Sequence, residues 1–322
     1  MFEGVCCAQR DREGIGVLRR GTRALWRAGR TIRGYSALDF LHGYVYGRWP
    51  YLYIGLATGE RRLPGILLPF VRLAGRLFMS SDRRDPEAGR RHLADRYHGK
   101  VVPTEAAEQL VTLKMPIELR DLEQIIPYAA ARDIVMSEPD RIVALECPCR
   151  SVRESPCLPL DVCLIIGEPF ATFVAEHHPD TARWITQGEA VDILRAERDR
   201  GHVHHAFFKD AMLGRFYAIC NCCSCCCGAM QAWRHGTPML ASSGYVAKVD
   251  RAACVACGSC AEICPFGALS VREGTLVLDA TACMGCGVCV GACPQGALSL
   301  KRDRAKGEPL RVRELVGDRM AR

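Results

Sequence analysis

The pattern of apolar and polar residues in the middle of the chain predicts alternating helices and strands. The segment ITQGEAVDILRAERDRG is predicted to be a helix, with Thr186 as its N-cap, Glu189 completing a capping box and Gly201 as its stop. HVHHAFF and GRFYAIC, which follow it, are predicted to be strands. Upstream, YHGKVVPTEAAEQLVTL and IIPYAAARDIVMSEPDRIVALE indicate helix-and-strand units, because Thr104 and Pro127 stand at typical helix starts.

The first hundred residues place arginines among apolar residues. Arginine occupies positions 19, 20, 23, 27, 30 and 33, interleaved with Leu18, Leu25, Trp26 and Ile32. A second element of this kind spans residues 62–78, and the polar stretch 82–91 is predicted to be a linker. This hundred holds 19 Lys and Arg against 9 Asp and Glu, a net charge of +10, whereas the remainder carries −3.

Three interpretations of this basic region stay open. It can be an amphipathic surface for a membrane or an acidic partner. Its aromatic residues among arginines can stack on nucleic-acid bases, a partner that we do not expect. It can also be a solvated basic face over a small core.

An internal repeat defines the C-terminal part of the chain. Residues 248–271, KVDRAACVACGSCAEICPFGALSV, return at 277–300 as VLDATACMGCGVCVGACPQGALSL, and each half contains C-x2-C-x2-C-x3-C-P. Two residues between successive cysteines let the chain curl around a cubane, while Gly258, Gly285 and Gly287 permit the tight backbone. The segment resembles the bacterial ferredoxin domain that binds two [4Fe–4S] clusters.

This resemblance implies both the fold and the ligands of the domain. It implies a β-α-β-β-α-β core, which apolar residues such as Val249, Phe266 and Leu298 can cover. In such ferredoxins the fourth cysteine of each motif ligates the other cluster. One cluster would then be held by Cys254, Cys257, Cys260 and Cys293, and the other by Cys283, Cys286, Cys289 and Cys264. A pair of zinc sites is the alternative, but two tandem motifs favour iron–sulfur clusters.

The number of cysteines changes the picture of the whole chain, which has 20 of them in 322 residues. The N-terminus MFEGVCCAQRDREG lacks the apolar segment of a secretory signal. Outside the cysteine-rich segments, no uncharged apolar run approaches the roughly 18 residues of a membrane span. We therefore expect a reducing, cytoplasmic compartment, where metal binding explains the cysteines better than a disulfide framework does.

Ten of these cysteines lie in the middle of the chain, in the segment ECPCRSVRESPCLPLDVCLIIG and the run ICNCCSCCC. They are Cys147, Cys149, Cys157, Cys163, Cys220, Cys222, Cys223, Cys225, Cys226 and Cys227. If the run is extended, Cys220, Cys222 and Cys226 share one side and the other three share the opposite side. If it is a loop, Cys220, Cys223 and Cys226 form C-x2-C-x2-C.

The number of thiols in the middle region exceeds what one cubane can use, because a cubane has four corners. Ten thiols are enough for two cubanes with two left over, or for one unusual cluster. We predict at least one additional iron–sulfur cluster here, with zinc as the alternative. His202, His204 and His205 in GHVHHAFF can serve as ligands on iron or be ordinary strand residues.

Motifs of known enzymes do not identify the middle region. The C-x3-C-x2-C of radical S-adenosylmethionine enzymes is absent, and the cysteine order departs from that of heterodisulfide-reductase-type domains. No Gly-rich phosphate loop supports a flavin or nicotinamide site. The region is similar to uncharacterised ferredoxin-fused proteins of anaerobic bacteria, which share an ECxCR element and a CNCCxCCC run. This resemblance implies no activity.

These observations predict an α+β protein with four parts. They are a basic, largely helical region 1–100, a mixed α/β cysteine-rich metal-binding domain 101–243, the dicluster ferredoxin-like domain 244–301 and a charged tail 302–322. The expected function is iron–sulfur electron transfer with a redox protein as partner. The alternatives are a reductase with a substrate-accessible cluster in the middle domain and a scaffold that delivers iron–sulfur clusters or metal. We expect a cytoplasmic protein, peripheral on the inner membrane face if the basic region binds there.

Overall fold

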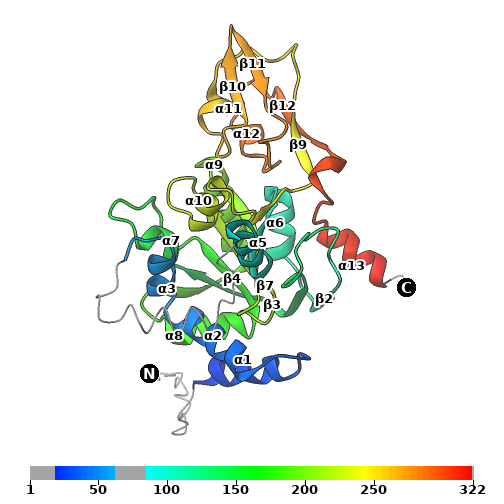
Figure 1. Cartoon of the computed structure of the whole chain (residues 1–322). Helices are drawn as coiled ribbons and strands as arrows, with labels where there is room; N and C mark the ends of the chain where they lie inside the picture. The colour runs from blue at the N-terminus through cyan, green and yellow to red at the C-terminus, as the bar shows by residue number, and fades with distance from the viewer. Residues whose placement is uncertain (1–18, 62–84, 321–322) are drawn as a thin grey trace, which may run out of the picture.

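The computed structural model describes residues 19–61 and 85–320 (Figure 1). The second basic element and residues 82–84 of the expected linker lie outside this part. The helices are α1 (Arg20–Arg30), α2 (Ala37–Arg48), α3 (Pro50–Ala57), α5 (Pro86–Arg96), α6 (Thr104–Val111), α7 (Pro148–Ser151), α8 (Phe170–His177), α9 (Gln187–Asp199), α10 (Gly228–Arg234), α11 (Ser259–Glu262), α12 (Val288–Gly291), the 3-10 helix η2 (Arg304–Lys306) and α13 (Val312–Met320). The strands are β1 (Tyr97–Val102), β2 (Ile117–Leu119), β3 (Ile134–Leu145), β4 (Cys163–Glu168), β5 (Ala182–Ile185), β6 (Val203–Lys209), β7 (Arg215–Cys222), β8 (Leu240–Ala241), β9 (Tyr245–Val249), β10 (Leu269–Arg272), β11 (Thr275–Leu278) and β12 (Leu298–Arg302).

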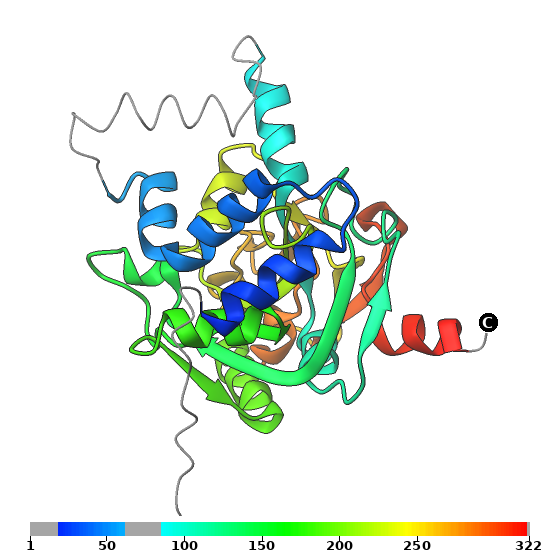
Figure 2. The same ribbon diagram turned by 90° about the horizontal axis from the view of Figure 1, so that it is seen from below.

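A mixed sheet organises the larger part of the molecule. Its strands follow the order β2-β3-β4-β7-β6-β1-β8, and β5 also pairs with β3. Strands β1 and β8 are parallel, whereas β4, β7, β6 and β1 pair antiparallel in turn. Helices α1–α3 and α8 lie on one side of the sheet (Figures 1 and 2). Their apolar side chains form one core cluster with it, and those of α6, α9 and α13 form a second cluster. Burial on both faces explains why β6 is buried along its whole length.

Most of the elements predicted for the middle region are confirmed, as is the α+β class. Strands β6 and β7 lie where the sequence placed them, and α6 begins at Thr104. Helix α9 has Thr186 as its N-cap, with the hydroxyl accepting a hydrogen bond from the backbone N–H of Glu189 at 3.1 Å. The capping box is only half present, because the Glu189 carboxylate pairs with Arg183 instead.

Two predictions about local structure are wrong. No helix starts at Pro127; the next residue, Tyr128, stacks on His98 with ring centroids 3.8 Å apart and donates to the Pro238 carbonyl at 3.0 Å. The stretch expected to be a linker contains the first residues of helix α5 instead. The Asp85 carboxylate caps this helix by accepting hydrogen bonds from two backbone N–H groups. In addition, the boundary expected at residues 100/101 falls inside β1.

The C-terminal domain has the predicted order β9-α11-β10-β11-α12-β12. Strand β9 pairs with β12 and β10 pairs with β11, both antiparallel. This domain lies at the opposite end of the molecule from α1 (Figure 1). It contacts the larger part through Ser243, whose hydroxyl donates to the Gly285 carbonyl at 2.7 Å, and through the rings of Trp233 and Phe266, with centroids 5.3 Å apart.

Candidate metal centres

Two hollows in the C-terminal domain are each lined by four cysteines. The first is lined by Cys254, Cys257, Cys260 and Cys293. The second is lined by Cys264, Cys283, Cys286 and Cys289. The fourth cysteine of each motif therefore lies with the first three of the other motif.

The backbone around these hollows suits sulfur ligands. Backbone N–H groups of Ala268 and Ala297 donate to Cys264 Sγ and Cys293 Sγ, each at 3.3 Å. Gly285 has a positive φ of 63°, and a Cβ there would lie 2.2 Å from the Tyr245 carbonyl oxygen. N–H groups aimed at thiolate sulfur and a backbone that only glycine permits are what an iron–sulfur cluster needs around it.

Seven of the ten middle cysteines line a single apolar cavity: Cys147, Cys149, Cys163, Cys220, Cys222, Cys223 and Cys227. We call it the six-thiol cavity, after the six that remain when Cys223, which also belongs to a more compact group described below, is set aside. The cavity has a volume of about 70 Å³. A single water needs only about 10–15 Å³ by this measure, so there is room for a larger group.

The thiols of this cavity form a continuous series. Cys163 and Cys220 are register partners on β4 and β7, and their Sγ atoms lie 3.6 Å apart. The hydrogen bond with Cys149, together with burial, raises the pKa of Cys147 to about 12. Hydrogen bonds with Cys147 and Cys220, and then burial, raise the pKa of Cys163 well above its usual value. Metal binding here must therefore release protons.

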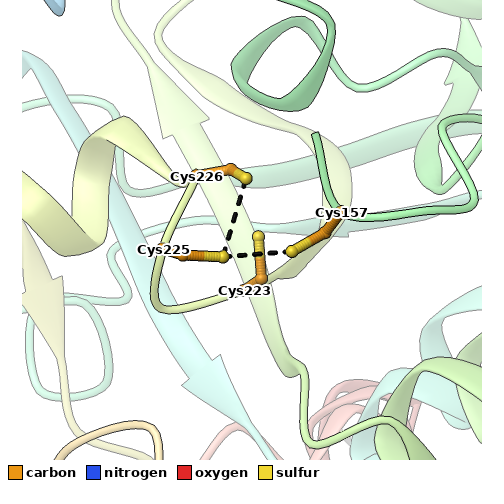
Figure 3. A group of neighbouring side chains, drawn as sticks. All are labelled: Cys157, Cys223, Cys225 and Cys226. Carbon is orange, nitrogen blue, oxygen red and sulfur yellow. Dashed lines mark hydrogen bonds between the residues drawn. The ribbon is translucent and has the colours of Figure 1, made fainter. Parts of the chain in front are cut away.

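Four middle cysteines form a more compact cluster, which we call the four-thiol group and which shares Cys223 with the lining of the cavity. It consists of Cys157, Cys223, Cys225 and Cys226, whose Sγ atoms all lie within 4.8 Å of one another (Figure 3). Cys223 and Cys226 are buried, whereas Cys225 is exposed and Cys157 is half-buried. The hydrogen bond with Cys225, together with partial burial, raises the pKa of Cys157 to about 11.

The path of the chain explains why the run divides in this way. Strand β7 ends at Cys222, so Cys220 and Cys222 share the face that period two predicts. A turn follows at residues 224–226 and brings Cys226 to the side of Cys223. After the turn, Cys227, the N-cap of α10, again lines the six-thiol cavity. Neither a fully extended run nor C-x2-C-x2-C describes this arrangement.

Arg150, the arginine of ECPCR, is a functional candidate that we did not single out from the sequence. Its side chain is fully buried and lines the six-thiol cavity. Nη2 donates to Glu197 Oε2 at 2.5 Å and to the Asn221 carbonyl at 2.9 Å, and Nη1 donates to the Pro159 carbonyl at 2.5 Å. Burial lowers its pKa, but the Glu197 carboxylate more than offsets this, so the pKa is raised and the guanidinium stays charged. A fixed positive charge thus lies among thiols that become negative on binding metal.

Three tyrosines, Tyr46, Tyr97 and Tyr217, also line the six-thiol cavity, and no sequence signal pointed to them. The hydroxyls of Tyr46 and Tyr217 lie 2.8 Å apart. The ammonium of buried Lys209 lies 4.7 Å from the ring centroid of Tyr46 and 4.5 Å from that of Tyr97. Burial lowers the pKa of Lys209 to about 8. Several groups that can carry protons therefore adjoin the cavity.

The three histidines of GHVHHAFF differ in their surroundings, although all are buried. His202 lies 2.7 Å from Glu197 Oε2 through Nδ1, and His204 Nδ1 donates to Asn221 Oδ1 at 2.6 Å. His205 is the register partner of Cys220, and neither of its ring nitrogens has a hydrogen-bond partner within the described residues. His205 is therefore the one of the three with both ring nitrogens unpartnered, although it is not among the residues that line the six-thiol cavity.

Comparison with known proteins supports this account for the C-terminal part. Residues 253–297 match the family model of the 4Fe–4S dicluster domain. Together with the two four-cysteine hollows, this match identifies a dicluster iron–sulfur domain in this part of the chain. No curated protein matches the chain, and the resemblance of the middle region to ferredoxin-fused proteins stays a prediction.

Proposed function

We propose that this chain is an electron-transfer protein with three iron–sulfur clusters. Two are held in the dicluster domain, by the cysteine sets that line its two hollows. The third is held in the six-thiol cavity. The observation that carries the proposal is the convergence of six thiols, from α7, β4, β7 and the start of α10, on one buried apolar cavity that Cys223 of the four-thiol group also lines.

The contact between the two parts supports a route for electrons. Phe266 lines the hollow of Cys264, Cys283, Cys286 and Cys289, and packs on Trp233 near the end of α10. The same helix begins at the N-cap Cys227, which lines the six-thiol cavity. A helix of seven residues spans only about 10 Å. The other hollow has Cys257 and Val255 exposed beside it, where a redox protein partner can dock.

Counting iron and sulfide tests the proposal. Anaerobically purified full-length protein should carry about twelve iron atoms and about twelve sulfides, because each cubane holds four of each. Replacing Cys149 and Cys163 together by serine should lower both counts to about eight and leave the electron paramagnetic resonance signal of the dicluster domain intact. Ser151→Ala, on the same helix as Cys149, is the matched control because it removes no sulfur. If protein reconstituted without oxygen never exceeds about eight iron atoms, the six-thiol cavity holds no cluster.

A reductase is the second candidate function, and the tyrosines favour it. Reduction of a substrate needs protons as well as electrons, and Tyr46, Tyr97 and Tyr217 lie at the same cavity as the six thiols. This candidate predicts that an added small molecule perturbs the spectrum of the middle-domain cluster without affecting the dicluster signals. The delivery scaffold of the sequence analysis predicts, instead, transfer of iron to a cluster-free ferredoxin.

We further propose that the basic region attaches the protein peripherally to an anionic membrane surface on the cytoplasmic side. Arg23, Arg27 and Arg30 are exposed on α1, and Leu38, Leu41, Trp49 and Leu52 are exposed on α2, at its C-cap or on α3. The three helices lie on one face of the molecule (Figure 2). Within the described residues no helix is long and apolar enough to cross a membrane. Cations beside exposed apolar residues suit the headgroup layer of a bilayer.

Co-sedimentation with lipid vesicles tests this attachment. Binding to anionic vesicles should be strong at low salt and weaken as salt screens the arginines, while binding to neutral vesicles stays weak. Replacing Arg23, Arg27 and Arg30 together by glutamine should abolish it, whereas Arg195→Gln, which changes an exposed arginine of α9, should not. Equal recovery with both vesicle types would instead favour an acidic protein partner or a merely solvated face.

A further inference from the structure

The four-thiol group has the dimensions of a site for one metal ion. Its four Sγ atoms lie within 4.8 Å of one another; those of Cys157 and Cys225 are 3.0 Å apart, and those of Cys225 and Cys226 are 3.6 Å apart (Figure 3). Four thiolates around a single zinc ion have metal–sulfur distances of about 2.3 Å, which places the sulfurs about 3.8 Å apart in a tetrahedron. These two separations lie below this value and the 4.8 Å limit lies above it, so the four sulfurs are close enough for one ion.

A cubane requires a wider set of sulfurs, because each thiolate binds a different iron atom at its own corner. The dicluster cysteines provide a comparison inside the same molecule. Across the residues that the structure describes, no three thiols outside the four-thiol group lie within 4.8 Å of one another, and this holds for all eight dicluster cysteines. The four-thiol group is therefore more compact than either set that fits a cluster.

The compact arrangement is built into the turn that carries three of the four cysteines. The backbone N–H of Cys227 donates to the Cys223 carbonyl at 3.2 Å and closes the turn. Two side chains of α10 also hold the backbone of the turn. Gln231 Nε2 donates to the Cys225 carbonyl at 2.8 Å, and Arg234 Nη1 donates to the Ser224 carbonyl at 2.6 Å. The turn is thus fixed by contacts that do not involve the thiols themselves.

The fourth cysteine comes from a different segment, the connection between α7 and β4. This connection carries Arg153, whose Nη2 donates to the Cys226 carbonyl at 3.2 Å and whose Nη1 pairs with Glu60. Among the described residues, the buried Nε of Arg153 has no hydrogen-bond partner. A cation with a spare donor beside four thiolates offsets part of the charge that the thiolates keep when they share one divalent ion.

We propose that Cys157, Cys223, Cys225 and Cys226 hold a single zinc ion that ties the α7–β4 connection to the cysteine run. Four thiolates fill the tetrahedron and leave no open position, as in structural zinc sites. Zinc also suits the exposure of this group, because it has no redox chemistry and protects adjacent thiolates at the surface from oxidation. The inference concerns the same ten cysteines as the proposed function but does not depend on a cluster in the six-thiol cavity.

Element analysis of paired variants tests the inference. Full-length protein, purified anaerobically from medium with both metals, should contain about one zinc per chain. Replacing Cys157 and Cys225 by serine should remove that zinc and leave iron and sulfide unchanged. Ser224→Ala, within the same turn, should keep it. The Cys149 and Cys163 double variant should keep the zinc and lose iron, so that failure of the zinc site and failure of the third cluster give different results.

X-ray absorption at the zinc edge provides a readout that needs no variant. Wild-type protein should show about four sulfur neighbours at about 2.3 Å and no iron neighbour. Retention of the dicluster signal in the Cys157 and Cys225 double variant establishes that the variant has folded. Loss of about four iron atoms and four sulfides from that variant would show a cubane instead and overturn the proposal. An unchanged zinc content, or zinc bound through nitrogen and oxygen, would overturn it as well.

Discussion

The dicluster domain and the middle region gather their thiols in different ways. The eight dicluster cysteines lie between residues 254 and 293, in two copies of one motif. The ten middle cysteines come from two segments, 147–163 and 220–227, with helix α9 and strand β6 between them. In the first case short-range spacing brings the thiols together; in the second the register of the sheet does, as with Cys163 opposite Cys220.

This difference determines which residues, besides the cysteines, are needed to hold each site. A motif that curls around its own cluster depends on local backbone freedom, and hence on glycines such as Gly285. A site assembled across a sheet depends on side chains that lock distant segments together. Arg150 does this, since it links α7 to α9 through Glu197 and to β7 through the Asn221 carbonyl. A substitution at either kind of position should therefore affect the clusters of one region and leave those of the other unchanged.

The largest effect is expected for Arg150→Met. The substitution keeps an unbranched side chain but removes the guanidinium, and so leaves the Glu197 carboxylate, which is 1% exposed, without its buried cation. Breaking a buried ion pair in this way costs about 3–5 kcal/mol. We expect destabilisation of this size in denaturant unfolding and loss of the middle-domain iron, with an unchanged dicluster signal.

Arg195→Met is the control for that variant. Arg195 also pairs with a glutamate, Glu108, but its side chain is 55% exposed, and such pairs contribute about 0–1 kcal/mol. A similar loss of stability or iron in both variants would show that the Arg150 network does not assemble the middle site.

An effect of similar size, but confined to the other region, is expected for Gly285→Ala. The added Cβ would lie 2.2 Å from the Tyr245 carbonyl oxygen and 2.4 Å from Ser243 Oγ, in a backbone with φ of +63°. Gly296→Ala is the matched comparison, because φ there is +60° but nothing lies within 4 Å. Strain alone costs about 1–3 kcal/mol, and the clash adds about as much again.

The measurement for this pair is the intensity of the dicluster signal after anaerobic reconstitution. Gly285→Ala should lose the signal of the cluster beside Cys286, and Gly296→Ala should retain both clusters. Equal behaviour of the two variants would mean that the close approach of the backbone at Gly285 has no role in holding the cluster.

The same contrast explains what could be predicted from the sequence. The dicluster fold was predictable because its ligand spacing and glycines are local, and helix α9 was predictable from the Thr186 cap. The helix expected at Pro127 failed because contacts of Tyr128 with His98 and Pro238, far away in sequence, fix that segment. The split of the cysteine run depends on where β7 ends and the turn begins, which spacing does not reveal.

A further effect is expected where the two regions join, at Lys100 on β1. Its ammonium donates to the Glu308 carbonyl at 2.8 Å, in the segment after the dicluster domain. Burial, together with the charge of Arg302, lowers the pKa of Lys100 to about 7. The unfolded chain therefore binds more protons between about pH 7 and pH 10.5, so this residue makes folding more favourable as pH rises through that window.

Lys100→Met removes this dependence. Its stability relative to wild type should fall as pH rises from about 7 to about 8.5, by at most about 1.4 kcal/mol per pH unit. Denaturant unfolding at several pH values measures the difference. Parallel pH profiles for the two proteins would contradict the buried, neutral state of Lys100.

The smallest effect is expected at His205, and it sharpens the comparison because it should alter only the middle-domain cluster. Burial, together with the charge of His204, lowers the pKa of His205 to about 3, so the ring is neutral at pH 7 and keeps one N–H. It lies opposite Cys220 in the β6–β7 register. A hydrogen bond from this N–H to a cluster sulfur would favour the reduced, more negative state of the cluster.

His205→Phe should therefore lower the reduction potential of the middle-domain cluster by about 40 mV, the equivalent of about 1 kcal/mol for one electron. Phe207→Leu, on the same face of β6 and in the lining of the six-thiol cavity, shows what a change of packing alone does to the potential, and the dicluster potentials serve as the internal reference in both variants. An unchanged middle-domain potential in His205→Phe would leave His205 as a packing residue only.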